Sequence, residues 1–302
     1  MVQVTVAGGV SSIARVVIDA ILEKKKHRVT SLTSQEVDSV DENGIHWKHA
    51  DYDNKSDLVN ILRGTDVLLC FFSARDTATV ARRQKNLIDA AVEAGVRRFA
   101  PAEYAGRNYN GMAMFEFKDD VLEYSLFQTG IFTNEFAYPH KTATHFEPLR
   151  MYVDFEARRA IQPGAGDHTI TLTTVEDIAA VVAEAVEFEG EWPRVGGICG
   201  SRLTVNELIR LGESVRGPFV VETVDEEAVE AGRLTTSWYP LIEHAGVPEG
   251  RKEELSKLAS LNFLKATING SWNVSEEWNN LLPHIQFTDA RRYLAQVWED
   301  KL

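Results

Sequence analysis

The sequence has few cysteines and no long apolar run. Its 302 residues include two cysteines, Cys70 and Cys199, which cannot build a disulfide framework and which favour a reduced, intracellular protein. No stretch of about 18 apolar residues occurs, so we expect no membrane-spanning helix. The N-terminal residues lack the basic and apolar segments of a signal peptide. Together these absences predict a cytoplasmic protein.

Positive charge is also scarce. The 32 lysines and arginines stand against 45 acidic residues, which gives a formal net charge of −13. A surface with this balance repels phosphates, so we expect neither a nucleic-acid partner nor binding to an anionic membrane. The hydrophobic fraction of 44% is nevertheless that of an ordinary globular chain, and the length suffices for one large domain or two small ones.

Several catalytic motifs are missing. The chain contains no Gly-x-Ser-x-Gly elbow and no Gly-x-x-x-x-Gly-Lys phosphate loop. None of the eight tyrosines has a lysine four residues later, so the Tyr-x-x-x-Lys pair of ordinary short-chain dehydrogenases is absent. His140 and His145 lie five residues apart, which is the wrong spacing for one helix face, and no cysteine or carboxylate partners are arranged nearby. We therefore expect no metal site.

What the chain does contain is an alternation of short apolar strands with amphipathic helices. Strands are expected at residues 3–7, 29–32, 45–49, 66–72, 98–100, 122–127 and 169–171, and helices at 13–22, 58–62, 79–94 and 175–186. Strands that are apolar on both faces predict a doubly wound parallel sheet of the α/β class, covered by helices on both sides. After residue 200 the chain is richer in helix, and its aromatic residues are expected to pack as core.

The turn after the first strand has the position of a dinucleotide-binding loop. Gly8 occupies the first glycine place of such a loop, whereas Ser11 and Ala14 stand where its second and third glycines occur. Ser11 and Ser12 are suited to donate hydroxyl hydrogen bonds to a phosphate at the helix N-terminus. The competing interpretation is a plain tight turn in which Ser11 or Ser12 caps the helix.

The end of the second strand does not select between NAD and NADP. An acidic residue there would bind a ribose 2′-hydroxyl, and a basic residue would bind a 2′-phosphate. The sequence offers Thr33, Ser34, Gln35 and Glu36, so the acidic residue comes late and arginine is missing. Ser34 can bond to either group, and the choice stays open.

Six segments together resemble one protein family. They are Ala7–Arg15, Ala50–Tyr52, Asn86–Phe99, Pro101–Tyr104, Thr173–Ala179 and Asn280–Trp298, and they span nearly the whole chain. The pattern resembles the NmrA-like and isoflavone-reductase-like group of atypical short-chain dehydrogenases/reductases. It is most similar to the fungal members that are often found with secondary metabolism.

The resemblance implies a Rossmann-like fold in two parts. Residues 1–150 would form the NAD(P)-binding domain, with its sheet completed by parts of residues 151–200. Residues 200–302 would form a smaller, mainly helical substrate-binding region. The implied cofactor is NADPH or NADP⁺, bound by Gly8, Gly9, Ser11, Ser12, Ile13, Ser34, Asp51, Phe72, Ser73 and Lys118.

The catalytic residue that the resemblance implies is Lys118. It is the only lysine in the stretch after the Pro-Ala-Glu loop, and in the family this lysine lies beside the nicotinamide and assists protonation. The alternative is a solvated helix lysine that pairs with Glu116, Asp119 or Asp120. Only five residues separate Lys118 from the strand residue Tyr124, so the helix before that strand is shorter than is usual in the family.

A substrate pocket is expected at the carboxyl ends of the strands, where open α/β sheets bind their ligands. Its expected residues are Arg75, Glu103, Tyr104, Gly130, Phe132, Trp238 and Tyr239. The resulting hypothesis is an NADPH-dependent reductase of a small, largely apolar substrate of the secondary-metabolite kind. Two alternatives stay open, namely an NADP(H)-binding regulatory protein without catalysis and a non-redox isomerase or cyclase. The oligomeric state is also left open.

Overall fold

The fold is that of a computed structural model, which describes residues 1–71, 77–107, 122–243, 249–299 and 301. Four predicted site residues, Phe72, Ser73, Arg75 and Lys118, lie outside the described residues. Within the described ranges, none of the helices combines the length and the apolar composition that crossing a bilayer requires.

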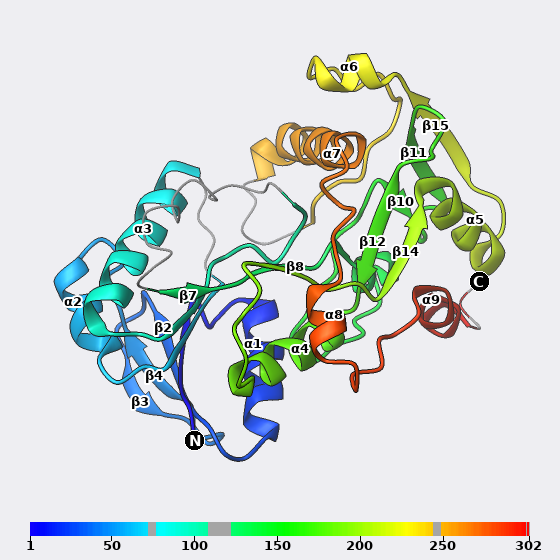
Figure 1. The fold of residues 1–302 in the computed structure, drawn as a ribbon. Helices are drawn as coiled ribbons and strands as arrows, with labels where there is room; N and C mark the ends of the chain where they lie inside the picture. The colour runs from blue at the N-terminus through cyan, green and yellow to red at the C-terminus, as the bar shows by residue number, and fades with distance from the viewer. Residues whose placement is uncertain (72–76, 108–121, 244–248, 300, 302) are drawn as a thin grey trace.

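A seven-stranded sheet forms the N-terminal part of the molecule (Figure 1). Its strands are β1 (Gln3–Ala7), β2 (Arg28–Thr33), β3 (Asp38–Val40), β4 (His46–His49), β5 (Val67–Cys70), β6 (Arg98–Ala100) and β7 (Glu123–Tyr124). They lie in the order β3-β4-β2-β1-β5-β6-β7, and only the edge strand β3 runs antiparallel to its neighbour. The strand order reverses at β1, which pairs with β2 on one side and with β5 on the other. The carboxyl ends of β1 and β5 therefore mark the switch point, where open α/β sheets bind ligands.

Helices cover both faces of this sheet. They are α1 (Ser12–Glu23), α2 (Lys55–Leu62), α3 (Thr77–Ala94) and α4 (Val175–Glu187). The helices α1 and α4 pack side by side on the face that carries Val4 and Val6. The helices α2 and α3 pack on the face that carries Leu68 and Cys70. Successive side chains of a strand point to opposite faces, and both faces here are buried. The predicted doubly wound sheet is confirmed.

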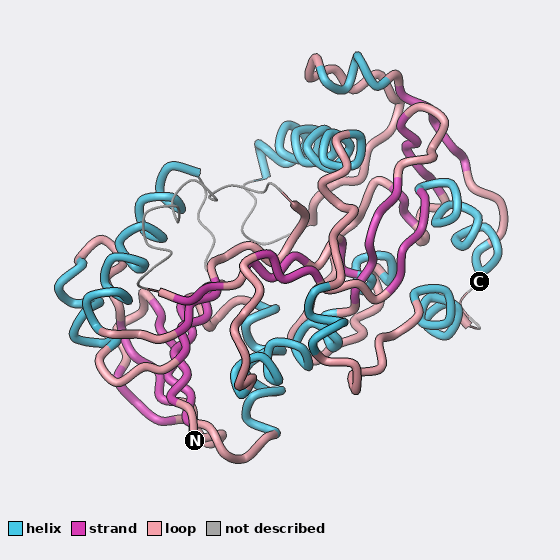
Figure 2. The backbone as a smooth tube through the Cα atoms, viewed as in Figure 1, coloured by secondary structure: helices cyan, strands magenta, loops and turns pink. Residues whose placement is uncertain are grey.

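The second part of the molecule consists of smaller sheets and the C-terminal helices (Figure 2). One sheet joins β10 (Val153–Asp154), β11 (Arg159–Pro163) and β15 (Val220–Val224), and another joins β9 (Ile131–Phe132), β12 (Thr169–Thr173) and β14 (Ser201–Thr204). Between the two parts, β8 (Leu126–Gln128) pairs with β13 (Val195–Gly197). The remaining helices are α5 (Val205–Arg216), α6 (Glu226–Glu230), α7 (Lys252–Ile268), α8 (Glu277–Leu281), α9 (Ala290–Trp298) and two short 3-10 turns, η2 (Thr133–Ala137) and η3 (Glu249–Arg251).

This second part contains residues from before and after position 200. The strand β12 pairs with β14, and β11 pairs with β15. Strands from residues 159–173 thus form sheets with strands from residues 201–224. One hydrophobic cluster includes both Ile161 and Leu264. Helices predominate after residue 200, as expected, whereas the domain boundaries at 150 and 200 stay a prediction.

The structure corrects the expected strands in two ways. The strand expected at 66–72 is Val67–Cys70, and the one expected at 122–127 is divided at Ser125 between β7 and β8. The strands β3, β9, β10, β11, β13, β14 and β15 were not expected from the sequence. They are two to five residues long, and β11 and β15 pair with each other from distant parts of the chain, so their local sequences carry little strand signal of their own.

Trp278 anchors the C-terminal segment to β8 and to the hydrophobic cluster that contains Val4 and Val6 of the main sheet. Its side chain is fully buried and stacks on Phe127, with ring centroids 5.3 Å apart. Its Nε1 donates a hydrogen bond to Ser125 Oγ at 3.3 Å. Trp272 and Trp298 are also buried, so the C-terminal tryptophans pack as core, as expected.

This anchor predicts a large loss of stability on truncation of Trp278. Trp278→Ala leaves an unfilled volume in the core and should lower the free energy of unfolding by about 3–5 kcal/mol. Leu281→Ala changes a residue of the same helix whose side chain is 39% exposed, and it should cost less than about 1 kcal/mol. Urea unfolding followed by far-UV circular dichroism measures both. Equal losses in the two variants would contradict the anchoring role.

Candidate functional site

The loop after β1 is held in a tight turn by hydrogen bonds. Gly8 has a φ of +75°, in the left-handed region that favours glycine. Its N–H lies 3.2 Å from the carbonyl oxygen of Leu32 and 3.1 Å from Tyr52 Oη, so the loop is tied to the end of β2. A Cβ at Gly9 would lie 1.8 Å from Ser31 Oγ, so this position also requires glycine. Gly8 thus permits the turn, and Gly9 permits the close approach of the loop to β2.

The helix α1 begins directly after this loop. The Ser11 hydroxyl oxygen accepts a hydrogen bond from the Ala14 N–H at 3.3 Å, so Ser11 is the N-cap. Of the two roles considered for Ser11, capping is the one that the structure shows. The N–H groups of Ser12 and Ile13 belong to the first turn, where an α-helix offers no internal acceptor. With the helix dipole, they make this end of α1 suited to a phosphate.

A cation on α1 lies beside β2 and β4. Ser34, the predicted cofactor residue here, is exposed directly after β2. The Arg15 guanidinium lies over the ring of Trp47, 5.2 Å from its centroid. Trp47 belongs to β4, which pairs with β2. Arg15 therefore places a positive charge on the α1 side of these two strands, although the sequence offers no arginine directly after β2.

Asp51 and Tyr52 differ in what they contact. Asp51 is exposed, and its carboxylate accepts a hydrogen bond from the backbone N–H of Asp53 at 2.9 Å, which stabilises its own turn. Tyr52 is buried, and its hydroxyl accepts the hydrogen bond from the Gly8 N–H. Burial raises the pKa of Tyr52 well above its ordinary value, so this phenol stays neutral. Tyr52 is therefore the residue of this pair that shapes the loop.

A cavity of about 180 Å³ opens among residues that follow β6 and β8. Its lining residues are Tyr104, Ala105, Gly130, Ile131, Phe132, Glu135, Met151, Phe263 and Trp272. Phe263 of α7 and Trp272 stack on each other with ring centroids 5.5 Å apart. Tyr104 stacks on Phe71, which directly follows β5, with centroids 4.2 Å apart. The walls of the cavity thus come from both the edge of the main sheet and the C-terminal helices.

Three polar groups in the cavity wall or next to it have few hydrogen-bond partners among the described residues. The Tyr104 hydroxyl and the Glu103 Oε1 are buried and make no hydrogen bond with the described residues. Burial raises the pKa of Glu103 to about 8. Burial also raises the pKa of Glu135 to about 8, against the opposing effect of the Leu149 N–H, which donates to its carboxylate. Both carboxyl groups therefore hold their protons near neutral pH, as general acids do.

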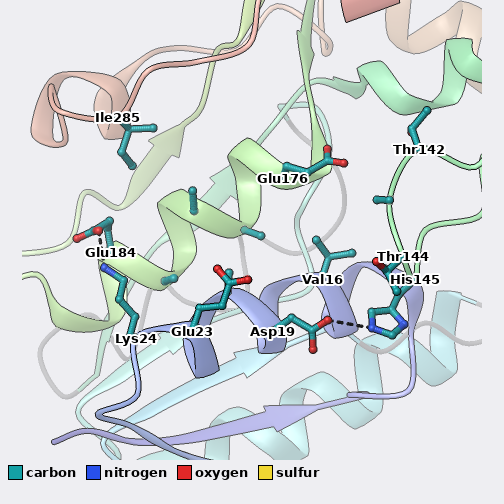
Figure 3. Close-up of a pocket in the computed structure, with 15 residues that line it drawn as sticks. Val16, Asp19, Glu23, Lys24, Thr142, Thr144, His145, Glu176, Glu184 and Ile285 are labelled. Carbon is teal, nitrogen blue, oxygen red and sulfur yellow. Dashed lines mark hydrogen bonds and ion pairs between the residues drawn. The ribbon is translucent and has the colours of Figure 1, made fainter. Parts of the chain in front are cut away.

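A second cavity, of about 550 Å³, runs along the helices α1 and α4 (Figure 3). Its lining includes the carboxylates of Asp19, Glu23, Glu176 and Glu184. His145 Nε2 lies 2.9 Å from Asp19 Oδ2, and Lys24 pairs with Glu184. This cavity lies against the helices rather than at the carboxyl ends of β1 and β5. Its charged lining distinguishes it from the apolar cavity beside Tyr104.

The sequence matches a known family along almost its whole length. The sequence model of the NmrA-like family matches residues 2–294. The chain belongs to the NmrA-like family. The resemblance drawn from the six sequence segments is thereby confirmed.

Relatives of this NmrA-like protein share its length and its fold. It is 28% identical to "Oxidoreductase swnN" of Metarhizium robertsii, over 99% of this chain and 98% of the relative. The structure of isoflavone reductase matches with a TM-score of 0.69 at 20% identity, over 97% of this chain and 98% of that one. The structure titled "AtPrR2 with NADP+ and (+)pinoresinol" matches with a TM-score of 0.68 at 18% identity, over 98% of each chain. These structures share the Rossmann-like fold of the NmrA-like protein.

The NmrA-like protein brings some of its predicted pocket residues together. Tyr104, Gly130 and Phe132 line the apolar cavity. Glu103 is buried next to Tyr104 in the chain but does not belong to the cavity wall. Trp238 and Tyr239 pack against the same hydrophobic cluster at another place, where the Arg159 guanidinium lies over Trp238. The roles of all these residues stay predictions, as do those of the four that lie outside the described residues.

The pocket residues expected from the sequence leave out six of the described residues of the cavity wall, namely Ala105, Ile131, Glu135, Met151, Phe263 and Trp272. The two aromatic residues were assigned to the core, because sequence alone does not distinguish a cavity wall from a packed interior. Glu135 did carry a signal, since it is the one charged residue in the run Ile131–Ala137. A carboxyl group inside an apolar run is a candidate for a site.

The buried Glu103 predicts a pH-dependent stability. Its carboxyl ionises near pH 4.5 when the chain is unfolded and near pH 8 when it is folded. The stability that the protonated group contributes is complete below about pH 4.5 and is lost as the pH rises towards 8, because unfolding then releases a proton. Glu103→Gln should flatten this decline and raise the free energy of unfolding at pH 8 by about 1–3 kcal/mol.

Urea unfolding at pH 5 and at pH 8 measures the effect. Glu147→Gln is the matched control, because Glu147 is exposed and pairs with Lys141. The same decline in the wild type and in Glu103→Gln would show that Glu103 ionises at an ordinary pH.

Proposed function

We propose that this chain is an NADP(H)-dependent reductase that acts on a small, largely apolar substrate. The observation that carries the proposal is the apolar cavity beside Tyr104, which lies at the ligand-binding edge of a doubly wound sheet. The Metarhizium robertsii relative is named an oxidoreductase, and the AtPrR2 structure contains NADP⁺ and (+)pinoresinol. These names support a redox reaction over the alternatives of a regulator or an isomerase.

The loop after β1 fits the pyrophosphate of such a cofactor. Gly8 permits the turn, and the N–H groups of Ser12 and Ile13 lie at the positive end of the α1 dipole. The Ser11 cap uses the oxygen lone pair of its hydroxyl, which leaves the O–H free to donate. Arg15, over Trp47, supplies a positive charge that suits the 2′-phosphate of NADP(H).

The cofactor and the protein chain contribute different parts of the proposed reaction. When bound, NADPH supplies a hydride for a polarised C=O, C=C or C=N carbon of the substrate. The chain's part is to orient the substrate, to exclude water and to supply a proton. The stacked rings of Phe263 and Trp272 give the cavity an apolar wall, which disfavours water beside the substrate. We assign the proton to Lys118, the lysine that the family resemblance indicates.

A substitution in the loop tests the cofactor site. Gly8→Val should abolish NADPH binding, because the side chain strains a backbone with a φ of +75° and blocks the approach of the pyrophosphate. Wild-type protein should bind NADPH more tightly than NADH. Titration by quenching of tryptophan fluorescence measures both affinities.

Gly64→Val is the matched control. Gly64 has a φ of +81° and lies between α2 and β5, at the end of the sheet opposite to the loop, with no atom near its added Cβ. This variant should be strained to a similar degree and should keep its affinity for NADPH. No saturable binding of either nucleotide to the wild type would remove the proposed function altogether.

Lys118 gives a test of the catalytic step. Lys118→Ala should lower kcat by about 10²–10⁴-fold with little change in NADPH affinity, since the pyrophosphate contacts lie elsewhere. Lys118→Arg should not restore the rate, because a guanidinium does not give up its proton. Lys141→Ala, which removes a surface ion pair with Glu147, is the control and should keep the wild-type rate.

The steady-state rate of NADPH oxidation measures these variants, and its outcomes separate the alternatives. A near-normal rate for Lys118→Ala would assign the proton to another group. Saturable NADPH binding without turnover across carbonyl, alkene and imine substrates would favour the regulatory alternative. Product formation without NADPH oxidation would favour the isomerase or cyclase.

A further inference from the structure

Among the described residues, the wall of the cavity beside Tyr104 contains one charged side chain, that of Glu135. The Leu149 N–H donates a hydrogen bond to this carboxylate, and among the described residues no lysine, arginine or histidine pairs with it. Within the described part of the chain, its other oxygen makes no hydrogen bond, so a ligand in the cavity can bond to it.

An unpaired carboxylate in such a place is costly. Removal of a charge from water without a partner is strongly unfavourable, and a protein relieves the cost by neutralising the group. Burial accordingly raises the pKa of Glu135 to about 8, so the group holds its proton while the cavity is without a cation. A cationic ligand would lower the pKa of Glu135 again, because an opposite charge at hydrogen-bond distance favours the ionised carboxyl group.

The aromatic residues of the wall favour the same kind of ligand. Phe132, Phe263 and Trp272 line the cavity with Tyr104, whose own ring stacks on Phe71 and Phe127. The faces of aromatic rings carry negative charge density and attract organic cations, most of all where water is excluded. The rings and the carboxyl group therefore select against anions and in favour of ammonium-type groups.

We propose that this cavity selects substrates that carry a basic nitrogen, an amine or an imine, which Glu135 holds as an ion pair within the aromatic wall. The inference rests on the proposed function, in which the same cavity holds the substrate. A neutral base that enters the cavity takes the proton of the Glu135 carboxyl onto its nitrogen lone pair. An N–H bond forms as the O–H bond breaks, and the pair becomes carboxylate and ammonium with no net proton taken up or released.

Two small probes of matched shape test this selection. Benzylamine and benzyl alcohol differ only in the polar group, and benzylamine is the base. With the NADP⁺-loaded protein, isothermal titration should show benzylamine binding at least about tenfold more tightly than benzyl alcohol, the minimum expected from a desolvated ion pair. Glu135→Gln should remove this preference by weakening benzylamine alone, while the affinity for benzyl alcohol stays within about twofold.

Two further variants control the test. Gln keeps an oxygen for the Leu149 N–H, so Glu135→Gln should fold, and its melting temperature checks this. Glu135→Asp keeps the charge and should retain part of the preference for benzylamine even if the Gln variant does not fold. Glu147→Gln makes the same chemical change at an exposed site that pairs with Lys141, and it should leave both affinities unchanged.

The outcomes distinguish this inference from the proposed function. Equal affinity of the wild type for the two probes, or a preference for benzylamine that persists in Glu135→Gln, overturns the inference and leaves the cavity as the substrate site. Binding of neither probe, in a protein that binds NADP⁺, removes the cavity as the substrate site and the inference with it. Loss of NADP⁺ binding itself would instead contradict the proposed cofactor.

Discussion

The fold depends on the pairing of β1 with two partners. β1 hydrogen-bonds to β2 along one edge and to β5 along the other, so the chain crosses over in opposite directions from this strand. Right-handed crossovers then place α1 on one face and α2 and α3 on the other, and α4 packs beside α1. The carboxyl ends of β1 and β5 meet between the two directions. The turn at Gly8 and the ring of Phe71 both lie at this edge, one directly after each strand.

A series of stacked rings links this edge to the C-terminal helices. Phe71 stacks on Tyr104 at 4.2 Å, Tyr104 on Phe127 at 5.8 Å, and Phe127 on Trp278 at 5.3 Å. The series begins at the cavity and ends at α8, whose tryptophan is fully buried. Since rings at these distances resist independent movement in a packed interior, the cavity wall is fixed by the same contacts that hold the two parts of the molecule together.

The sequence predicted those features that depend on local pattern. The apolar strand Val67–Cys70 was recognisable because it is buried on both faces, and α4 was recognisable from its periodicity. The strands β11 and β15 were not, because an exposed or proline-containing segment becomes a strand only through its distant partner. The residues of the candidate site also divide into those with a local pattern and those that depend on distant contacts. Gly8 and Tyr104 carry a local motif, whereas the contribution of Trp272 to the cavity depends on a contact with residues far away in the chain.

Arg98 and the residues near the cavity differ in how their polar groups are partnered. Arg98 is 3% exposed, and each of its three guanidinium nitrogens donates a hydrogen bond, one to Glu123 and two to backbone carbonyl oxygens. The Glu103 Oε1 and the Tyr104 hydroxyl are buried without a partner among the described residues, and the half-buried Glu135 accepts one hydrogen bond from the Leu149 N–H. A buried polar group without a partner destabilises a fold, and an apolar side chain at the same place would not. The Tyr104 hydroxyl and the Glu135 carboxyl group both belong to the cavity wall, where a ligand can complete the hydrogen bonds that the described residues leave open.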